Sequence, residues 1–277
     1  CNHWDVTKIS FSTYACSLQA MDTGFETRAF LIDEKNELWT ASKKGYVRIY
    51  QPDGSLKGYL TPEGTISSQP ISFQKNIYCF MEDENGIIWM GSKLDGLFRL
   101  TRDSKDHFLI RQFTHQENNP YSLSNNSIYS IYQDHQKRIW IGCYGGGLNL
   151  LEETAEGEIR FIHNNNRLKE YPKGHFTKVR YITEVNNAIL VCTTEGLLTF
   201  SSEFKRPEDI CFYRNLRHPD EVSSLSSNDV TYVYTDNRKA TYILTFTGGI
   251  NKVLSENLLS EHIEFKPYTT KDGLPSD

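Results

Sequence analysis

Long apolar segments are absent from this sequence. No apolar run in the 277 residues approaches the roughly 18 residues that a membrane-spanning helix needs. The first residues, CNHWDVTKIS, are too polar for a secretory signal peptide. We therefore expect any targeting or membrane-spanning segment to lie outside this chain.

An excess of basic charge and the common catalytic motifs are absent too. The chain has 30 Lys and Arg against 35 Asp and Glu, so it lacks the basic surplus of a nucleic-acid-binding protein. It contains no HExxH, GxSxG or P-loop pattern, and its eight histidines have no metal-ligand spacing. We therefore predict no catalytic residue, no metal site, no cofactor and no nucleic-acid partner.

None of the six cysteines forms a CxxC pair, which disfavours a zinc knuckle. Cys79, Cys143 and Cys192 lie inside apolar, strand-like runs. Free cysteine in such surroundings is usually buried, so we expect these three thiols to be unreactive.

What the sequence does contain is an internal repeat. Three segments are nearly alike, FLIDEKNELWTASKKGYVRIY, FMEDENGIIWMGSKLDGLFRL and IYQDHQKRIWIGCYGGGLNLL, and two more fit loosely, ITEVNNAILVCTTEGLLTF and VYTDNRKATYILTFTGGINKV. They align on anchor residues that are 50 to 52 positions apart: Trp39, Trp89, Trp140, Leu190 and Tyr242. A glycine follows each anchor six or seven residues later, at Gly45, Gly96, Gly147, Gly196 and Gly249. Copies in phase along the chain indicate a repeat architecture.

Each copy predicts one blade of a β-propeller. An apolar strand ends at an acidic residue that opens a tight turn, and these residues are Asp33, Asp83, Asp134 and Asp236, with Glu184 in the fourth copy. A second strand carries the anchor, the glycine turns the chain into a third strand, and a less regular fourth strand follows, as at 108–113 and 210–213. Such a pattern is typical of a propeller. We predict an all-β, partial β-propeller of four-stranded blades, with about five full blades and remnants of two.

The expected blades follow the phase of the repeat within one propeller domain. Residues 1–20 are interpreted as the end of a preceding blade, and residues 269–277 as the linker that opens a next blade. The full blades are expected at 21–70, 71–120, 121–172, 173–222 and 223–268.

The pattern of an apolar strand, D-x-x-G, L/I-W-I/M-G-S/T and a G-G-L step resembles the two-component regulator propeller repeat, and the tail KDGLPSD is similar to the blade linker of that family. The resemblance implies the periplasmic sensor region of a hybrid two-component histidine kinase of Bacteroidetes, anchored in the inner membrane. It implies that the remaining blades, a second propeller and the kinase lie outside this chain, and that the full receptor is a homodimer. Its ligand would be an oligosaccharide that regulates polysaccharide-utilisation genes.

Repetition separates the residues of the frame from the residues of a ligand site. The anchors Trp39, Trp89, Trp140 and Tyr242 recur at one position, so we expect them to pack between blades. The loops between the second and third strands differ between copies, and binding can diverge there on a repeated frame. These loops carry the candidate ligand-binding residues Lys43, Lys44, Lys93, Asp95, Tyr144, Thr194, Glu195 and Phe246.

Three functions stay open at this point. The sequence favours a carbohydrate sensor that binds its ligand without turnover. The second possibility is a propeller-type glycosidase or lyase, and a glycosidase would need a pair of carboxylates flanking the bond. The third is a protein-interaction or dimerisation scaffold, which would present a flat apolar patch.

Overall fold

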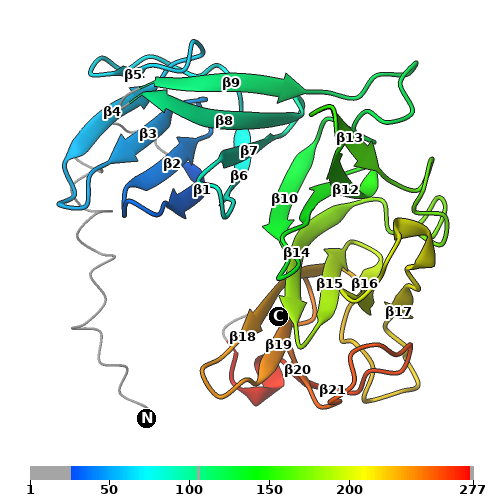
Figure 1. The fold of residues 1–277 in the computed structure, drawn as a ribbon. Coiled ribbons are helices and arrows are strands. Elements are labelled where there is room, and N and C mark those ends of the chain that lie inside the picture. Colours follow the sequence, from blue (N-terminus) through cyan, green and yellow to red (C-terminus); the bar gives the residue numbers. More distant parts are fainter. Residues whose placement is uncertain (1–25, 105–106, 275–277) are drawn as a thin grey trace.

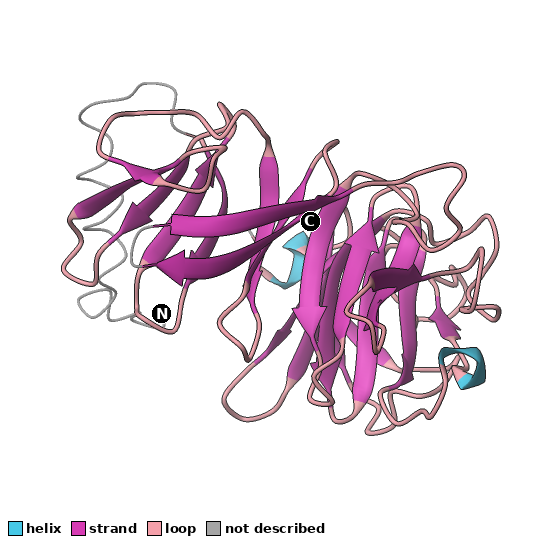
Figure 2. Ribbon diagram, turned by 45° about the horizontal axis from the view of Figure 1, so that its top comes forward, coloured by secondary structure: helices cyan, strands magenta, loops and turns pink. Residues whose placement is uncertain are grey.

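The computed structural model describes residues 26–104 and 107–274. These residues form five antiparallel sheets, each built from strands that are consecutive in the sequence. The helical elements in these two ranges are short 3-10 turns at Pro207–Asp209 and Thr270–Asp272 (Figure 2). The predicted all-β fold is therefore confirmed.

The strands of each sheet follow the order of the chain. The first sheet contains β1 (Thr27–Ile32), β2 (Leu38–Ser42), β3 (Val47–Tyr50), β4 (Leu56–Leu60) and the short β5 (Ile66–Ser67). The second contains β6 (Ile77–Glu82), β7 (Ile88–Ser92), β8 (Leu97–Ser104) and β9 (His107–Phe113). The third contains β10 (Ile128–Gln133), β11 (Ile139–Cys143), β12 (Gly147–Glu153) and β13 (Ile159–Ile162). The fourth contains β14 (Val179–Val185), β15 (Ala188–Thr193), β16 (Gly196–Ser201) and β17 (Tyr213–Asn215). The fifth contains β18 (Val230–Thr235), β19 (Thr241–Thr245), β20 (Ile250–Val253) and β21 (Phe265–Tyr268).

The sheets follow one another along an arc, with the first and fifth sheets at its two ends (Figure 1). The first strand of each sheet lies on the inner side of the arc, and neighbouring first strands contact each other. This is the arrangement of blades in a β-propeller. The first sheet has a fifth strand beyond the four predicted, because the chain turns back at residues 61–65 and β5 pairs with β4.

The two terminal segments of the predicted blade division are described only in part. The expected remnant at 1–20 lies outside the described residues. Within the expected linker, Thr269 caps the 3-10 turn at Thr270–Asp272. The ends of the individual blades stay predictions.

A buried carboxylate closes the turn between the first and second strands in three sheets. Oδ1 of Asp83 accepts hydrogen bonds from the backbone N–H groups of Asn85 and Ile87, at 2.9 and 3.1 Å. Its Oδ2 accepts a third bond from Nε1 of the anchor Trp89, at 2.9 Å. The same indole-to-carboxylate bond joins Trp39 to Asp33 at 3.0 Å and Trp140 to Asp134 at 2.9 Å. The repeated aspartate therefore forms the turn and also holds the anchor ring.

The anchor tryptophans are buried against the neighbouring sheet. Trp39 packs edge-on against Phe80 and Phe108 of the second sheet, with ring centroids 6.4 and 5.4 Å apart. Trp140 packs edge-on against Phe200 of the fourth sheet at 5.0 Å. Because large aromatic side chains dominate the energetics of a core, these contacts stabilise one sheet on the next.

The glycine step after the second strand is required by geometry. Gly96 has a φ of 78°, and a Cβ atom there would lie 2.1 Å from the carbonyl oxygen of Phe113. Gly249 has a φ of 74°, and its Cβ atom would lie 2.2 Å from the carbonyl oxygen of Tyr268. Only glycine reconciles the left-handed backbone with such an approach of the fourth strand.

The fourth sheet corrects two predictions. Glu184 does not open the turn after β14, because a two-residue turn at Asn186 and Asn187 does so, with φ values of 49° and 63°. Asparagine tolerates this left-handed conformation, which tight hairpins use. The turn is one residue shorter than in the third sheet, so counting back from Leu190 assigned Glu184 to the wrong position. The fourth strand begins only at Tyr213, because a 3-10 turn at Pro207–Asp209 precedes it.

Cys143 and Cys192 are buried, as the sequence predicts, whereas Cys79 is only partly buried. Burial raises the pKa of Cys79 to about 12 and the pKa of Cys143 to about 11. Burial also raises the pKa of Cys192. Thiols with such pKa values stay protonated near neutral pH and are poor nucleophiles.

Candidate functional site

Every first strand carries one extra residue at its second position. In all five sheets the pairing with the second strand skips this residue, which produces a β-bulge. A bulge leaves one residue outside the ladder and redirects its side chain, and bulges are frequent beside functional sites. The bulged residues are Arg28, Tyr78, Tyr129, Arg180 and Thr231.

A second repeated contact lies at the same end of each sheet. The residue after the second strand donates its backbone N–H to the carbonyl of the residue before the first strand, at 2.7 to 3.2 Å. The five donors are Lys43, Lys93, Tyr144, Thr194 and Phe246, and the five acceptors are Glu26, Asn76, Ser127, Lys178 and Asp229. We call these ten residues and the five bulged residues the mouth.

Three tyrosine rings form a column in the mouth. The ring centroids of Tyr78 and Tyr129 are 4.8 Å apart, and those of Tyr129 and Tyr144 are 4.6 Å apart with an angle of 20° between the planes. Burial raises the pKa of Tyr129 above its ordinary value of 10.0, and the neighbouring Tyr78 and Tyr144 add to this effect. The Tyr129 hydroxyl is therefore neutral near pH 7.

Cations lie over the ends of this column. The guanidinium of Arg28 lies 5.5 Å from the ring centroid of Tyr78. At the other end, Lys178 and Arg180 lie 5.7 and 5.9 Å from the centroid of Tyr144. Arg180 also lies 5.8 Å from the centroid of Phe246, whose side chain is 65% exposed. Cations within about 6 Å of an aromatic face are attracted to it, so these contacts position the charges.

An ion pair joins the fourth and fifth sheets in the mouth. Nε and one terminal nitrogen of Arg180 donate to the two carboxylate oxygens of Asp229 at 2.7 and 2.9 Å. This bidentate geometry holds the guanidinium in a fixed orientation. Through its contacts with Tyr144 and Phe246, Arg180 links three consecutive sheets.

The predicted loop residues divide into two groups. Lys43, Lys93, Tyr144, Thr194 and Phe246 occupy one equivalent position of the mouth, and Arg180 connects two of them, Tyr144 and Phe246. The remaining three, Lys44, Asp95 and Glu195, lie further into the turns. Lys43 pairs with Glu26 at 3.1 Å, Asp95 pairs with Lys75 at 2.7 Å, and Glu195 lies 3.2 Å from the ring of His175.

Sequence reasoning missed the bulged residues. They nevertheless carry a signal, because each lies 11 residues before its anchor, or 10 residues before it in the fourth sheet with its shorter turn. Arg28, Tyr78, Tyr129 and Arg180 would have been found by comparing polar and aromatic residues in that phase of the repeat.

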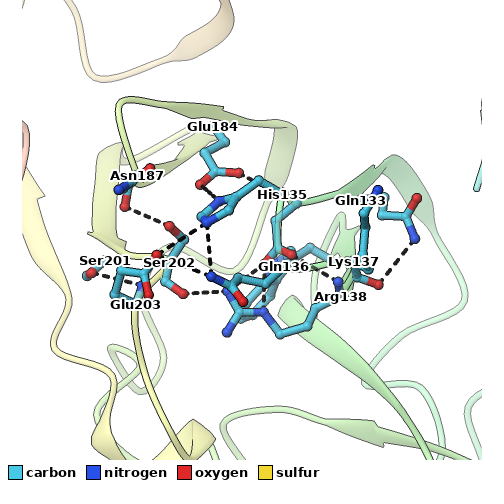
Figure 3. A network of polar contacts seen from close by, with 12 residues as sticks. Gln133, His135, Gln136, Lys137, Arg138, Glu184, Asn187, Ser201, Ser202 and Glu203 are labelled. Atoms are coloured by element: carbon cyan, nitrogen blue, oxygen red, sulfur yellow. Dashed lines mark hydrogen bonds and ion pairs between the residues drawn. The ribbon is translucent and has the colours of Figure 1, made fainter. Parts of the chain in front are cut away.

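The opposite end of the third and fourth sheets carries a different polar network (Figure 3). Nδ1 of His135 lies 2.5 Å from Oε1 of Glu184, and Oε2 of Glu184 accepts the backbone N–H of His135 at 3.0 Å. Glu203 adds a contact with Nε2 of His135 at 3.2 Å. The bond to Glu184 raises the pKa of His135 above 6.5. The arrangement bridges two sheets at their turns.

Comparison with known proteins confirms the resemblance in two blades. The family model described as "Two component regulator propeller" matches residues 72–93 and 122–145, which contain the first two strands of the second and third sheets. The chain is 27% identical over 132 residues to histidine kinase P4 of Formosa agariphila. The aligned region covers 45% of this chain and 9% of the kinase. The chain thus spans a small part of this relative.

Solved structures share the fold. The extracellular domain of a hybrid two-component system from B. thetaiotaomicron has a TM-score of 0.64 and 20% identity, over 91% of this chain and 30% of that one. A catalytically inactive virginiamycin B lyase from Staphylococcus aureus has a TM-score of 0.59 and 15% identity, over 91% and 73%. PorZ of Porphyromonas gingivalis has a TM-score of 0.55 and 17% identity, over 82% and 32%. Across residues 26–104 and 107–274, no helix is long and apolar enough to cross a membrane.

Proposed function

We propose that this chain is the periplasmic recognition module of a membrane-anchored hybrid two-component receptor. In this proposal the mouth binds an oligosaccharide, and the bound state regulates polysaccharide-utilisation genes. The observation that carries the proposal is the mouth itself, where three backbone positions recur in all five sheets with different side chains. The repeat matches, the similarity to a histidine kinase and the shared fold support the receptor context.

The chemistry of the mouth suits a polyhydroxylated ligand. Sugars are bound by aromatic groups together with charged or planar hydrogen-bonding groups. Here the faces of the tyrosine column are covered by one another and by Arg28, Lys178 and Arg180. The groups proposed to contact the ligand are therefore the tyrosine hydroxyls, the cations and the exposed ring of Phe246.

The fifth sheet supports the proposal that further blades complete the propeller. Its face exposes Tyr232 by 42% and Tyr234 by 54%, and Tyr242 is only partly buried there. This face borders an open hollow of about 740 Å³. In the other sheets the equivalent face packs against the next sheet, so we propose another blade as its partner. A second propeller and a dimeric receptor belong to the same proposal.

A propeller lyase is the alternative, because one structural relative is a virginiamycin B lyase. The two acidic side chains of the mouth both face basic groups: Glu26 lies 3.1 Å from Lys43, and Asp229 binds Arg180. Carboxylates engaged in this way suit a binding site better than an acid–base pair. We therefore propose binding without turnover.

The test is a calorimetric titration of the full chain with a panel of neutral and acidic oligosaccharides, followed by analysis of the sugars for cleavage products. We expect binding of at least one oligosaccharide, no product, and weaker binding by the variants Tyr129→Phe and Tyr144→Phe. Tyr121→Phe, which lies outside the mouth, should bind as the wild type does. Product formation, or a complete lack of binding to the panel, would contradict the proposal.

A further inference from the structure

We infer that the mouth accepts an anionic saccharide, one that carries carboxylate or sulfate groups. This inference rests on the proposed function, because it assigns a chemical class to the oligosaccharide that the mouth would bind. Different outcomes of its experimental test contradict this inference and the proposed function.

The charge of the mouth is opposite to the charge of the chain. The fifteen mouth positions include five basic and two acidic side chains, whereas the whole chain has a net charge of -5. The basic residues are Arg28, Lys43, Lys93, Lys178 and Arg180. Two further carboxylates in the turns nearby, Asp95 and Glu195, face Lys75 and His175. The surplus of the mouth is therefore positive.

The surplus cations are accessible. Lys93 and Lys178 are exposed, while the carboxylates of the mouth face Lys43 and Arg180. Lys178 is held over the ring of Tyr144, beside Arg180. An ammonium held in this way can donate a charge-assisted hydrogen bond to a carboxylate or sulfate oxygen of the ligand.

The guanidinium of Arg28 reinforces this preference at the other end of the column. It lies over Tyr78, and a carboxylate oxygen of Glu26 lies 3.8 Å from one of its terminal nitrogens. Stacking on a ring leaves the N–H edge of a guanidinium available, and its planar fork matches a carboxylate. Cations at both ends of one aromatic column thus suit an extended ligand with more than one negative group.

Matched pairs of sugars test the class of ligand directly. Trigalacturonate and its fully methyl-esterified form differ in charge, and a sulfated oligosaccharide and its desulfated form supply a second pair. We expect the full chain to bind at least one anionic member about tenfold more tightly than its neutral partner, a difference of roughly 1.4 kcal/mol. The preference should shrink as ionic strength rises, because salt screens exposed charges. The pair that shows the preference identifies carboxylate or sulfate as the recognised group.

Charge-removing variants locate the effect. Lys93→Gln and Lys178→Gln should each weaken binding of the preferred anionic sugar by about tenfold, the order expected for one charge-assisted bond, and should weaken binding of the neutral partner by a smaller factor. Lys35→Gln is the matched control, because Lys35 is exposed at the opposite, turn end of the first sheet. Equal losses with Lys35→Gln would show unspecific attraction and overturn the inference. Equal or tighter binding of neutral sugars would overturn it while leaving the proposed function standing. Binding of neither class would overturn both.

Discussion

At the turn end of the first three sheets the same aspartate and tryptophan recur, whereas at the mouth the same backbone positions recur with different side chains. The aspartates and tryptophans are buried, and most mouth residues are exposed or partly exposed. A residue present in several blades serves what those blades share, which is the packing of one sheet on the next. A position kept with changing chemistry leaves room for a specific function. The comparison predicts that substitutions at the two ends will separate stability from binding.

The largest difference is expected between an anchor and an exposed aromatic residue of the mouth. Trp140→Ala should lower the free energy of unfolding by about 3–5 kcal/mol, because it empties a large buried site and removes the indole bond to Asp134. Phe246→Ala should change it by no more than about 0.5 kcal/mol, as exposed substitutions usually do. Urea denaturation of both variants measures the contrast. Equal midpoints would show that the two ends do not differ in the way we describe.

A smaller effect is expected from the carboxylate that holds the anchor. Asp83→Asn replaces one acceptor oxygen by an NH2 group, so either the turn amides or the indole of Trp89 loses its partner. The cost should be about 1–3 kcal/mol, the penalty for an unsatisfied buried group. Asp236→Asn is the control, because Asp236 accepts two backbone N–H groups in the fifth sheet, where Tyr242 replaces the tryptophan. A loss for Asp236→Asn as large as for Asp83→Asn would argue against the importance of the indole bond.

A third contrast lies within the mouth. Arg180→Gln removes the bidentate pair with Asp229, which is only partly buried, so the free energy of unfolding should fall by at most about 1 kcal/mol. Binding of the preferred oligosaccharide should fall by more than tenfold, roughly 1.4 kcal/mol or more. Arg206→Gln, which removes an exposed pair with Asp209 outside the fifteen mouth residues, should affect neither measurement. A stability loss without a binding loss would make Arg180 a purely structural residue.

The frame could be predicted from the sequence because its residues are repeated. Asp33, Asp83 and Asp134 recur with a tryptophan six residues later, and burial makes both residues hard to replace. The hydrogen bond from the indole to the carboxylate was not predicted, because the turn-forming role of the aspartate already accounts for its recurrence. Glu184 was misassigned because a one-residue shortening of its turn shifts the count from the anchor.

The sequence indicated only some of the residues that form the candidate site. The loop residues were chosen as candidates because they interrupt the repeat, as at Tyr144 and Phe246, and their role in binding stays a prediction. The bulged residues were missed because a bulge depends on strand pairing, and no hydrophobic pattern marks it. Arg28, Tyr78 and Thr231 share a position but no chemistry, so residue similarity alone does not reveal the equivalence of the bulged residues.

The smallest effect is expected at the turn end, where the contact between His135 and Glu184 makes stability depend on pH. His135 is exposed at the turn, yet its bond to Glu184 raises its pKa above 6.5. Burial alone would raise the pKa of Glu184, but the hydrogen bonds from His135 and Ser202 lower it below 4.5. A raised histidine pKa gives stability that is complete below the unfolded pKa near 6.5 and is lost as the pH rises through the folded value. A lowered carboxyl pKa gives stability that is present above 4.5 and is lost as the pH falls through the folded value.

The contact should therefore be strongest between about pH 4.5 and 6.5. His135→Gln should be less stable than the wild type within this window, and the difference should narrow as the pH rises above it. Urea midpoints at a series of pH values measure this, with His262→Gln as the control, because the exposed His262 contacts no carboxylate among the described residues. The stability of Glu184→Gln should likewise depend less on pH than that of the wild type, because the substitution removes the carboxylate that pairs with the imidazole of His135. A difference between His135→Gln and wild type that stays constant across the series would mean that the ring acts through packing or hydrogen bonding alone. If Glu184→Gln leaves the pH dependence intact, Glu203 rather than Glu184 holds the proton on His135.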